Sequence, residues 1–171
     1  MATMETCHLY LVRHAIAAER GPEWPDDTKR PLTHRGVARM RMVATGMRSI
    51  GVRVDVVCTS PLVRARQTAK LLVECLRPKP ESVVVPALAP GHSPASVVKA
   101  LQRAPVASSL MLVGHEPDLG RLAAWFIGAR EPLSFKKGGV CRIDVASAAR
   151  PRDGVLVWMA TPKMLRALAG D

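Results

Sequence analysis

Residues 8–14, His8-Leu9-Tyr10-Leu11-Val12-Arg13-His14, decide the fold. The stretch is a short apolar run with polar residues on both sides, the pattern of a buried strand in a parallel sheet. Two basic residues stand where the run ends, and a polar loop rich in Gly, Pro and Asp follows them. The stretch therefore predicts a strand that ends at a turn carrying Arg13 and His14.

From this strand outward, apolar runs typical of strands alternate with stretches of helical spacing along the whole chain. Further strands are predicted at 54–58, 83–85, 110–113, 140–145 and 155–159, and helices at 33–50, 60–76, 93–101 and 119–126, with a short one after Thr161. Three helices are expected to begin at the caps Thr33, Ser60 and Ser93. This alternation predicts an α/β fold of three layers, with a mostly parallel six-stranded sheet and helices on both faces. A length of 171 residues predicts a single domain over 1–171.

The charge balance invites an anionic partner. The chain has 25 Lys and Arg against 14 Asp and Glu, a formal charge of +11. A basic nucleic-acid-binding module is therefore an alternative function of a different class. Against it, the cations are scattered, with no dense run beyond Lys136-Lys137, and two Phe, one Tyr and three Trp make a base-stacking platform improbable. We expect no nucleic-acid partner.

The cysteine spacing and the hydropathy of the sequence indicate the cellular compartment in which the protein is expected. The four cysteines form no CxxC pair, which excludes zinc-ribbon and dithiol redox motifs. Residues 1–6 carry no basic-then-apolar signal region, and no apolar run approaches the ~18 residues of a membrane span. We expect a cytoplasmic protein with reduced thiols and no membrane contact.

Basic side chains follow three of the predicted strands. Arg13 and His14 follow the first strand, Arg64 lies in the helix after the second, and His115 and Glu116 follow the fourth. Because ligands of open α/β sheets bind beyond the carboxyl ends of the strands, these residues are expected to converge on one rim.

The converging residue types suit phosphoryl transfer. Two guanidiniums offer forked donors to phosphate oxygens. A neutral imidazole can act as the nucleophile, and a second, protonated imidazole can stabilise charge that develops on the phosphoryl group. Walker-type glycine loops, HExxH and Mg-binding carboxylate clusters are all missing from the sequence. The residues therefore predict transfer through a histidine, with no metal and no cofactor.

Four ordered motifs resemble those of the histidine phosphatase superfamily. They are Leu11-Val12-Arg13-His14-Ala15, Leu32-Thr33 with Arg35-Gly36, Ser60-Pro61-Leu62 with Arg64-Ala65 and Gln67-Thr68, and Val113-Gly114-His115-Glu116-Pro117. The small size and the closing stretch from Trp158 to Lys163 resemble the bacterial phosphohistidine phosphatases of the SixA type. The resemblance implies a phosphoglycerate-mutase-like fold and a covalent phosphohistidine intermediate on His14. It also implies that Arg13, Arg64 and His115 bind the phosphate.

One departure from the family pattern bears on the substrate. Many members of the superfamily carry an acidic residue in the loop after the third strand, but residues 86–92 contain no carboxylate. Another branch places its acid directly after the second histidine, where Glu116 stands. Glu116 is thus either the general acid or a carboxylate that complements the following helix dipole, and His92 in the same loop has no assigned role.

The missing loop acid favours an N–P bond over an O–P bond. An imidazole leaves as a neutral heterocycle once it is protonated near neutral pH, whereas an alkoxide leaves badly. The predicted partner is therefore a phosphohistidine-bearing protein. The alternative is a small-molecule phosphomonoester.

Overall fold

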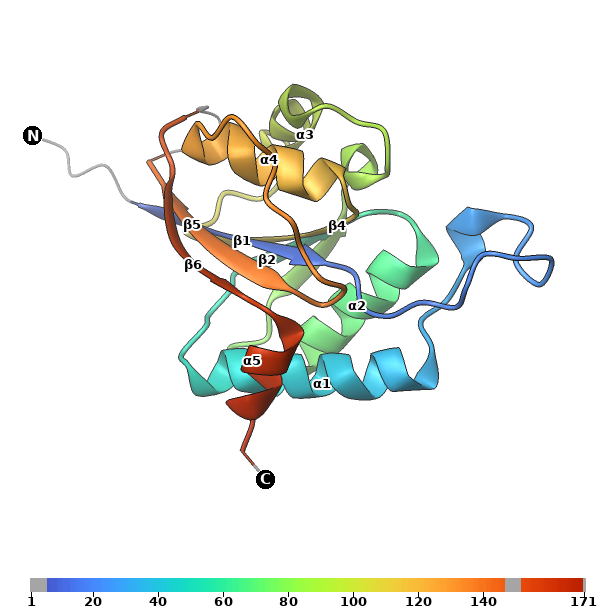
Figure 1. The fold of residues 1–171 in the computed structure, drawn as a ribbon. Helices are drawn as coiled ribbons and strands as arrows, with labels where there is room; N and C mark the ends of the chain where they lie inside the picture. Colours follow the sequence, from blue (N-terminus) through green and yellow to red (C-terminus); the bar gives the residue numbers. More distant parts are fainter. Residues whose placement is uncertain (1–5, 147–151, 171) are drawn as a thin grey trace, which may run out of the picture.

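A computed structural model describes residues 6–146 and 152–170, which form one sheet of six strands in the order β3-β2-β4-β1-β5-β6 (Figure 1). The strands are β1 Cys7–Arg13, β2 Val56–Thr59, β3 Glu81–Val84, β4 Ser109–Gly114, β5 Val140–Val145 and β6 Val155–Ala160. β1, β4, β2 and β3 pair in parallel, whereas β5 runs antiparallel to β1 and to β6. The mostly parallel six-stranded sheet is confirmed. The reversal of β5 was not predicted, because an apolar run carries no direction.

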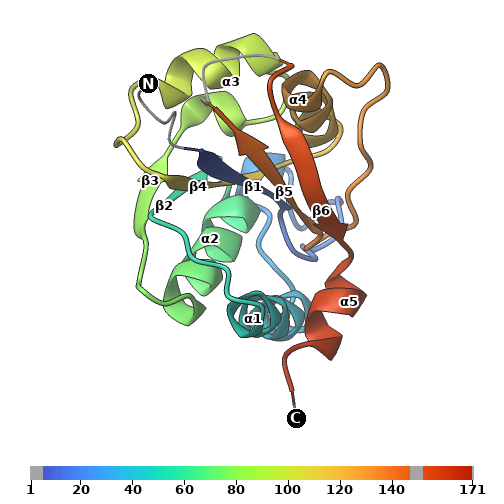
Figure 2. The ribbon, with the colours of Figure 1, turned by 90° about the vertical axis from the view of Figure 1, so that its left-hand side faces the viewer.

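In the described part of the chain, five α-helices cover the two faces of the sheet. They are α1 His34–Ser49, α2 Val63–Cys75, α3 Pro94–Leu101, α4 Asp118–Ile127 and α5 Pro162–Ala167. Figure 2 shows α3 and α4 on one face and α1, α2 and α5 on the other. Successive residues of β1 point to opposite faces of the sheet. Tyr10 and Val12 belong to the core on the side of α1 and α2, and Leu9 and Leu11 belong to the core on the side of α4. The predicted three-layer architecture is confirmed.

Three of the helix starts follow from their caps. Thr33 accepts a hydrogen bond from the Gly36 amide at 2.9 Å, and Ser93 and Thr161 cap α3 and α5 in the same way. The prediction that Ser60 caps α2 is wrong. α2 begins later, at Val63, and its N-cap residue makes no side-chain bond. Ser60 is instead fully buried, and its hydroxyl accepts a hydrogen bond from the Leu62 amide at 3.3 Å.

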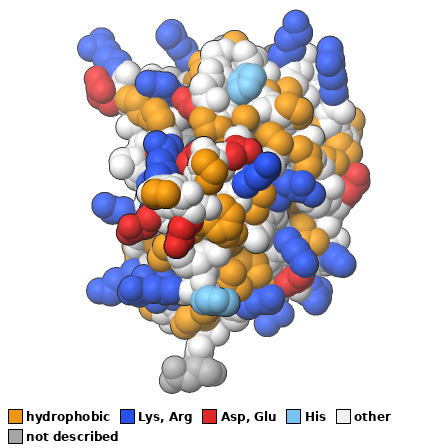
Figure 3. All heavy atoms as spheres, turned by 90° about the vertical axis from the view of Figure 1, so that its right-hand side faces the viewer, with side chains coloured by type: hydrophobic (Ala, Val, Ile, Leu, Met, Phe, Trp, Pro, Cys, Tyr) orange, Lys and Arg blue, Asp and Glu red, His pale blue; other side chains and the backbone are white. Residues whose placement is uncertain are grey.

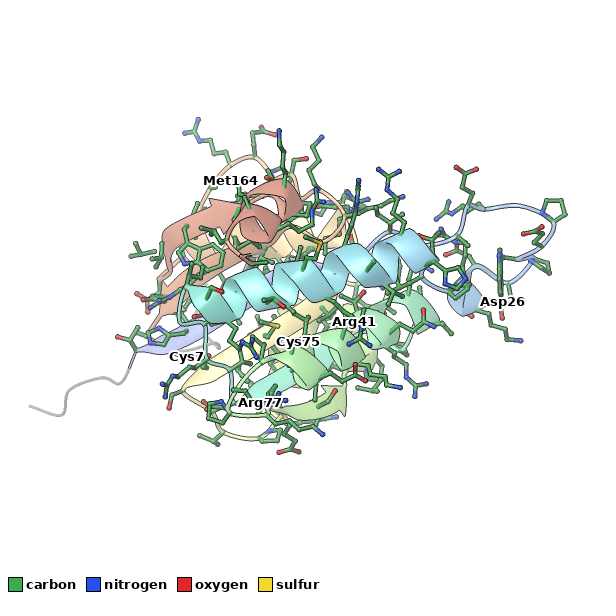
Figure 4. The ribbon with its side chains drawn as sticks, turned by 90° about the horizontal axis from the view of Figure 1, so that it is seen from below. Cys7, Asp26, Arg41, Cys75, Arg77 and Met164 are labelled. Atoms are coloured by element: carbon green, nitrogen blue, oxygen red, sulfur yellow. The ribbon has the colours of Figure 1, made fainter. Side chains whose placement is uncertain are left out.

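The chain from 18 to 31 leaves the sheet and returns to it as a closed loop. A β-bridge between Ala17 and Leu32 and a bond from the Ala18 amide to the Pro31 carbonyl at 2.8 Å hold its base. Figure 1 shows this loop projecting beyond the carboxyl ends of β1 and β4, and Figure 4 marks Asp26 on it. The loop therefore stands beside the rim where the predicted site residues lie. Within the described part of the chain, every helix is too short or too polar to cross a membrane.

Candidate active site

The two histidines of the predicted site lie side by side at the carboxyl ends of β1 and β4. The ring centroids of His14 and His115 are 5.1 Å apart. Both rings are almost fully buried, with 6% and 3% of their residue surface exposed. Arg64, the second residue of α2, is buried beside them with 3% exposed. The parallel strands thus bring residues from distant parts of the sequence to one place.

The protonation of His14 is fixed by its own backbone neighbourhood. Its Nδ1 atom lies 2.7 Å from the carbonyl oxygen of Ala15. A carbonyl oxygen only accepts hydrogen bonds, so Nδ1 carries the hydrogen and Nε2 keeps its lone pair. Burial lowers the pKa of His14 to about 4, although the bond to Ala15 acts the other way. Nearby positive charges lower it further: Arg64, Arg13 and Lys137. At neutral pH the ring is a neutral imidazole with a free nucleophilic nitrogen.

His115 has the same tautomer for a different reason. The Ser60 hydroxyl lies 2.8 Å from His115 Nε2 and accepts a hydrogen bond from the Leu62 amide at 3.3 Å. Because Ser60 is fully buried, its own hydrogen points to His115 Nε2, which leaves the ring hydrogen on Nδ1.

Burial and the charges of neighbouring groups change the expected charge of His115. Burial lowers its pKa to about 3, and proximity to His14, Arg64 and Arg13 adds to this effect. In the free protein the ring is therefore neutral at neutral pH. A neutral ring with its hydrogen on Nδ1 can still donate to a phosphoryl oxygen, and a bound dianion would raise this pKa.

The two arginines are each held by hydrogen bonds from their terminal Nη atoms. Arg13 Nη1 donates to the Phe135 carbonyl at 2.7 Å. Arg64 donates to Asp27 twice, to the backbone carbonyl at 2.7 Å and to Oδ2 at 3.0 Å. In both cases the Nε–H is left without a partner in the described protein. The bonds orient each guanidinium and leave its Nε–H available to a ligand.

Unsatisfied buried donors mark the position of a ligand. Buried polar atoms in proteins are almost always hydrogen-bonded. Across the described residues, the buried side-chain nitrogen or oxygen atoms without a partner are Arg13 Nε, Arg64 Nε and His115 Nδ1. All three are N–H donors, and all three belong to residues predicted from the sequence to bind phosphate. Their arrangement around His14 suits an anion with several oxygen atoms.

Asp27 contacts the candidate site, although the sequence did not indicate it. Its carboxylate contacts Arg64, Arg30 and Arg20, each at 3.0 Å. Partial burial acts to raise the pKa of Asp27, but the three guanidiniums outweigh it and lower the pKa. The carboxylate therefore fixes Arg64 and ties the 18–31 loop to the site. No local pattern could reveal this, because the contact depends on the loop folding back over α2.

Two polar residues of α2 fasten the chain that follows β1. Thr68 accepts a hydrogen bond from the Ala15 amide at 3.1 Å, and Gln67 accepts one from the Leu32 amide at 2.7 Å. Both residues belong to the quoted motif, but the motif gave them no role. Their contacts explain the need for them: they hold the backbone on either side of the 18–31 loop against the helix that carries Arg64.

Glu116 makes a contact that neither sequence interpretation foresaw. Its Oε1 accepts a hydrogen bond from the Phe135 amide at 2.9 Å, and the Phe135 carbonyl is the acceptor for Arg13. Gly120 permits this approach, since a Cβ there would collide with the Leu133 carbonyl. Glu116 thus anchors the segment that orients Arg13. His92 is exposed on the surface.

Comparison with known proteins places the chain in a family. Residues 9–88 match the histidine phosphatase superfamily (branch 1). An uncharacterized protein of Picosynechococcus is 38% identical over 164 residues, which cover 92% of this chain and 98% of that protein. The phosphohistidine phosphatase SixA of Escherichia coli is 27% identical over 166 residues, which cover 94% of this chain and 99% of SixA.

Solved structures agree with this placement. The structure of the protein histidine phosphatase SixA with tungstate superposes with a TM-score of 0.80 at 27% identity, covering 92% of this chain and 99% of SixA. A phosphoglycerate mutase from Plasmodium falciparum shares the fold, with a TM-score of 0.61 at 18% identity over 90% of this chain and 89% of the mutase. On these grounds the chain belongs to the histidine phosphatase superfamily and is a phosphatase that resembles its SixA-type members.

Proposed function

We propose that this phosphatase hydrolyses phosphohistidine carried by a protein, through a covalent phosphoryl intermediate on His14. The observation that carries the proposal is the arrangement of a buried, neutral His14 with a free Nε2 lone pair beside three buried N–H donors that have no partner in the described protein. A nucleophile and a set of donors for oxygen anions are the two requirements for metal-independent phosphoryl transfer.

In the first step, His14 Nε2 attacks phosphorus. A new N–P bond forms on His14 while the bond between phosphorus and the substrate nitrogen breaks, and the electron pair of that bond goes to the leaving imidazole. The N–H groups of Arg13, Arg64 and His115 donate to the phosphoryl oxygens, where negative charge concentrates. The bond from His14 Nδ1–H to the Ala15 carbonyl stabilises the positive charge that the attacking ring acquires.

The leaving imidazole needs one proton. The segment from 86 to 92 holds no carboxylate, and Glu116 Oε1 is engaged by the Phe135 amide. An imidazole has a pKa near neutrality, so solvent can protonate it, whereas an alkoxide needs a positioned acid. A proton from Glu116 is therefore needed only for leaving groups that are more basic than imidazole. In the second step water attacks phosphorus, His14 recovers its lone pair, and phosphate is released.

The choice of phosphohistidine as the substrate rests on the leaving group, because residues 86–92 offer no carboxylate that could protonate an alkoxide. The name of SixA, phosphohistidine phosphatase, agrees with this choice.

A small-molecule phosphomonoester is the alternative substrate. The deciding experiment compares phosphohistidine protein, an aryl phosphate and an alkyl phosphate with the purified enzyme, with and without EDTA. We expect phosphohistidine protein to be hydrolysed with much the highest kcat/KM, and EDTA to have no effect. Equal rates for phosphohistidine and alkyl phosphate would favour the alternative, and loss of activity in EDTA would overturn the metal-independent mechanism.

A further inference from the structure

A small cavity with three cations among its lining residues lies against Ala15, the residue that follows His14. It has a volume of about 50 Å³ and is formed between the start of α1, the segment before β5 and α5. Its lining includes Ala15, the residue after His14, and three cations: Arg39, Lys137 and Arg166. Gly138, also in the lining, donates its amide hydrogen to the carbonyl oxygens of Arg13 and His14 at 3.1 Å. We call this place the cationic hollow.

The cations of the hollow are not neutralised by the protein. Within the described residues, no carboxylate lies within 4.0 Å of the charged nitrogens of Arg39, Lys137 or Arg166. Arg35 stands one helical turn before Arg39 and is likewise unpaired there. Desolvation and the like charges of Arg35 and Arg166 lower the pKa of Arg39. The fold therefore holds the like charges of Arg35, Arg39 and Arg166 near one another, with Lys137 on the same cavity, and the described residues supply no counter-charge within salt-bridge distance.

This cluster differs from the other cations near the site. Arg64, Arg30 and Arg20 share the Asp27 carboxylate, and Arg142 is paired with Asp144. Figure 3 shows the face that carries the carboxyl ends of the parallel strands, with Lys and Arg side chains spread over most of it. An anionic surface that approached this face would meet unpaired positive charge beside His14, and like-charge crowding in the hollow would be relieved.

The form of the hollow selects among anionic partners. Arg39 and Arg166 are half-buried along helices that pack together, and Lys137 is exposed on the neighbouring segment. Figure 4 shows α1 between α2 and α5, with Met164 on α5. A volume of 50 Å³ admits a carboxylate but not a nucleobase, and the lining contains no Phe, Tyr or Trp on which a base could stack. Carboxylates of a protein surface fit these properties better than RNA does.

We propose that the cationic hollow binds acidic side chains that flank the phosphohistidine on the substrate protein. This inference rests on the proposed function, because it assigns the chemistry of the surface around the scissile phosphoryl group. The hollow would then be a specificity site, separate from the donors that bind the phosphoryl group itself. It would raise the rate of encounter with an acidic partner and lower KM for that partner.

The test uses two phosphohistidine peptides that are identical except for the residues flanking the phosphohistidine, which are glutamates in one and lysines in the other. We expect wild-type enzyme to hydrolyse the glutamate peptide with a kcat/KM at least about fivefold higher. The double variant Arg39→Glu with Arg166→Glu should abolish or reverse this preference. The preference in the wild type should also fall as salt rises, since these charges are close to solvent.

The double variant Arg53→Glu with Arg103→Glu is the matched control, since it changes the net charge by the same amount. Both arginines are exposed and each precedes a parallel strand, Arg53 before β2 and Arg103 before β4, at the end of the sheet opposite the site, so the preference should stay intact. Circular dichroism and unfolding curves for each variant show whether the fold is kept. If the double variant of Arg39 and Arg166 does not fold, Arg39→Gln alone, which removes the charge but keeps a polar side chain, should still reduce the preference.

The outcomes separate this inference from the proposed function. Equal hydrolysis of both peptides by the wild type would overturn the inference and leave phosphohistidine as the substrate. Hydrolysis of aryl phosphate but of neither peptide would overturn the proposed function and the inference with it. A third outcome would overturn the inference in favour of RNA. In that case a single-stranded RNA oligonucleotide inhibits aryl phosphate hydrolysis by the wild type but not by the double variant of Arg39 and Arg166, and a glutamate-rich peptide does not inhibit.

Discussion

The Ser60 hydroxyl and the His115 Nε2 atom are 2.8 Å apart in a buried environment, and this bond determines which nitrogen of His115 carries hydrogen. With Nε2 accepting from Ser60, Nδ1 is left as an N–H donor without a partner in the described protein. A serine that sequence analysis assigned to a helix cap therefore acts as a positioning residue for the second histidine.

Ser60→Ala should lower kcat by about tenfold or more, because Nε2 would lose its donor and the Nδ1–H tautomer would no longer be enforced. Nitrogen NMR of the imidazole should show a loss of the fixed tautomer in the variant. Ser82→Ala, at an exposed position of β3, serves as the control. An unchanged tautomer together with an unchanged kcat would contradict the positioning role.

His14→Ala should abolish turnover while the fold is retained. Wild-type enzyme mixed with labelled substrate should carry a label that is acid-labile and base-stable, as expected for a phosphoryl group on nitrogen, and the variant should carry none. His34→Ala, which removes an exposed histidine at the start of α1, should label normally. Label that persists in His14→Ala would assign the nucleophile to another residue.

Arg64→Ala should weaken binding of vanadate and phosphate. Loss of hydrogen bonds to a charged group costs on the order of 1.5–3 kcal/mol, equivalent to a roughly tenfold to hundredfold rise in Kd. Arg66→Ala, an exposed cation on the same helix, should change Kd little. Calorimetric titration with vanadate measures both. Equal affinity in the wild type and Arg64→Ala would remove Arg64 from the phosphate site.

Two substitutions of Glu116 separate its anchoring contact from an acid role. Glu116→Gln keeps an oxygen that can accept from the Phe135 amide but cannot transfer a proton, whereas Glu116→Ala loses both properties. If Glu116 is a general acid, Glu116→Gln should slow alkyl phosphates more than aryl phosphates, and phosphohistidine hardly at all. If it only anchors the segment that orients Arg13, Glu116→Gln should be near normal and Glu116→Ala should slow all substrates alike. Rates across a leaving-group series decide between the two.

The buried histidines should make stability depend on pH. In the unfolded chain a histidine has a pKa near 6.5, whereas the folded values are about 4 for His14 and about 3 for His115. Between pH 6.5 and 5 the unfolded state takes up protons that the folded state does not, so the free energy of unfolding should fall as pH falls. This contribution is complete above pH 6.5. Urea unfolding at pH 7.5, 6 and 5 should show the decline.

The same measurement has an internal control. The decline between pH 6.5 and 5 should shrink when His14 and His115 are both replaced by alanine, and it should remain in His34→Ala. Vanadate at saturating concentration should also reduce it, because a bound anion favours the protonated ring of His115. An equal decline in the wild type and the double variant would show that other groups cause it.

Prediction from sequence worked where a local pattern has one structural meaning. The apolar run of β1 and the cap at Thr33 follow from periodicity. The positions of Arg13, His14 and His115 at strand ends, and of Arg64 in the helix that follows β2, follow from the geometry of parallel sheets. These features depend on neighbours in sequence or on a rule that applies to every sheet of this class.

It failed where a residue's role depends on a partner far away in sequence. Asp27 meets Arg64 only because the 18–31 loop returns over α2, and Ser60 meets His115 only because β2 and β4 are adjacent. The low pKa of His115 in the free protein could not be foreseen either, since burial is its largest cause and the motif cannot report burial. Glu116 was noticed because it directly follows His115 in the sequence, but its hydrogen bond with the Phe135 amide could not be foreseen.

The three unpaired buried donors also connect catalysis to the persistence of the fold. Folding removes Arg13 Nε, Arg64 Nε and His115 Nδ1 from water and gives them no partner within the described protein, at a cost of about 1–3 kcal/mol for each such group. We expect orthophosphate, the product of the proposed reaction, to restore those bonds and to bind the native state alone, so that the melting temperature should rise with its concentration. Inhibition of the enzyme by its product and stabilisation of the fold by that product would then depend on one binding equilibrium. A variant that binds orthophosphate too weakly to be inhibited should also lose the rise in melting temperature.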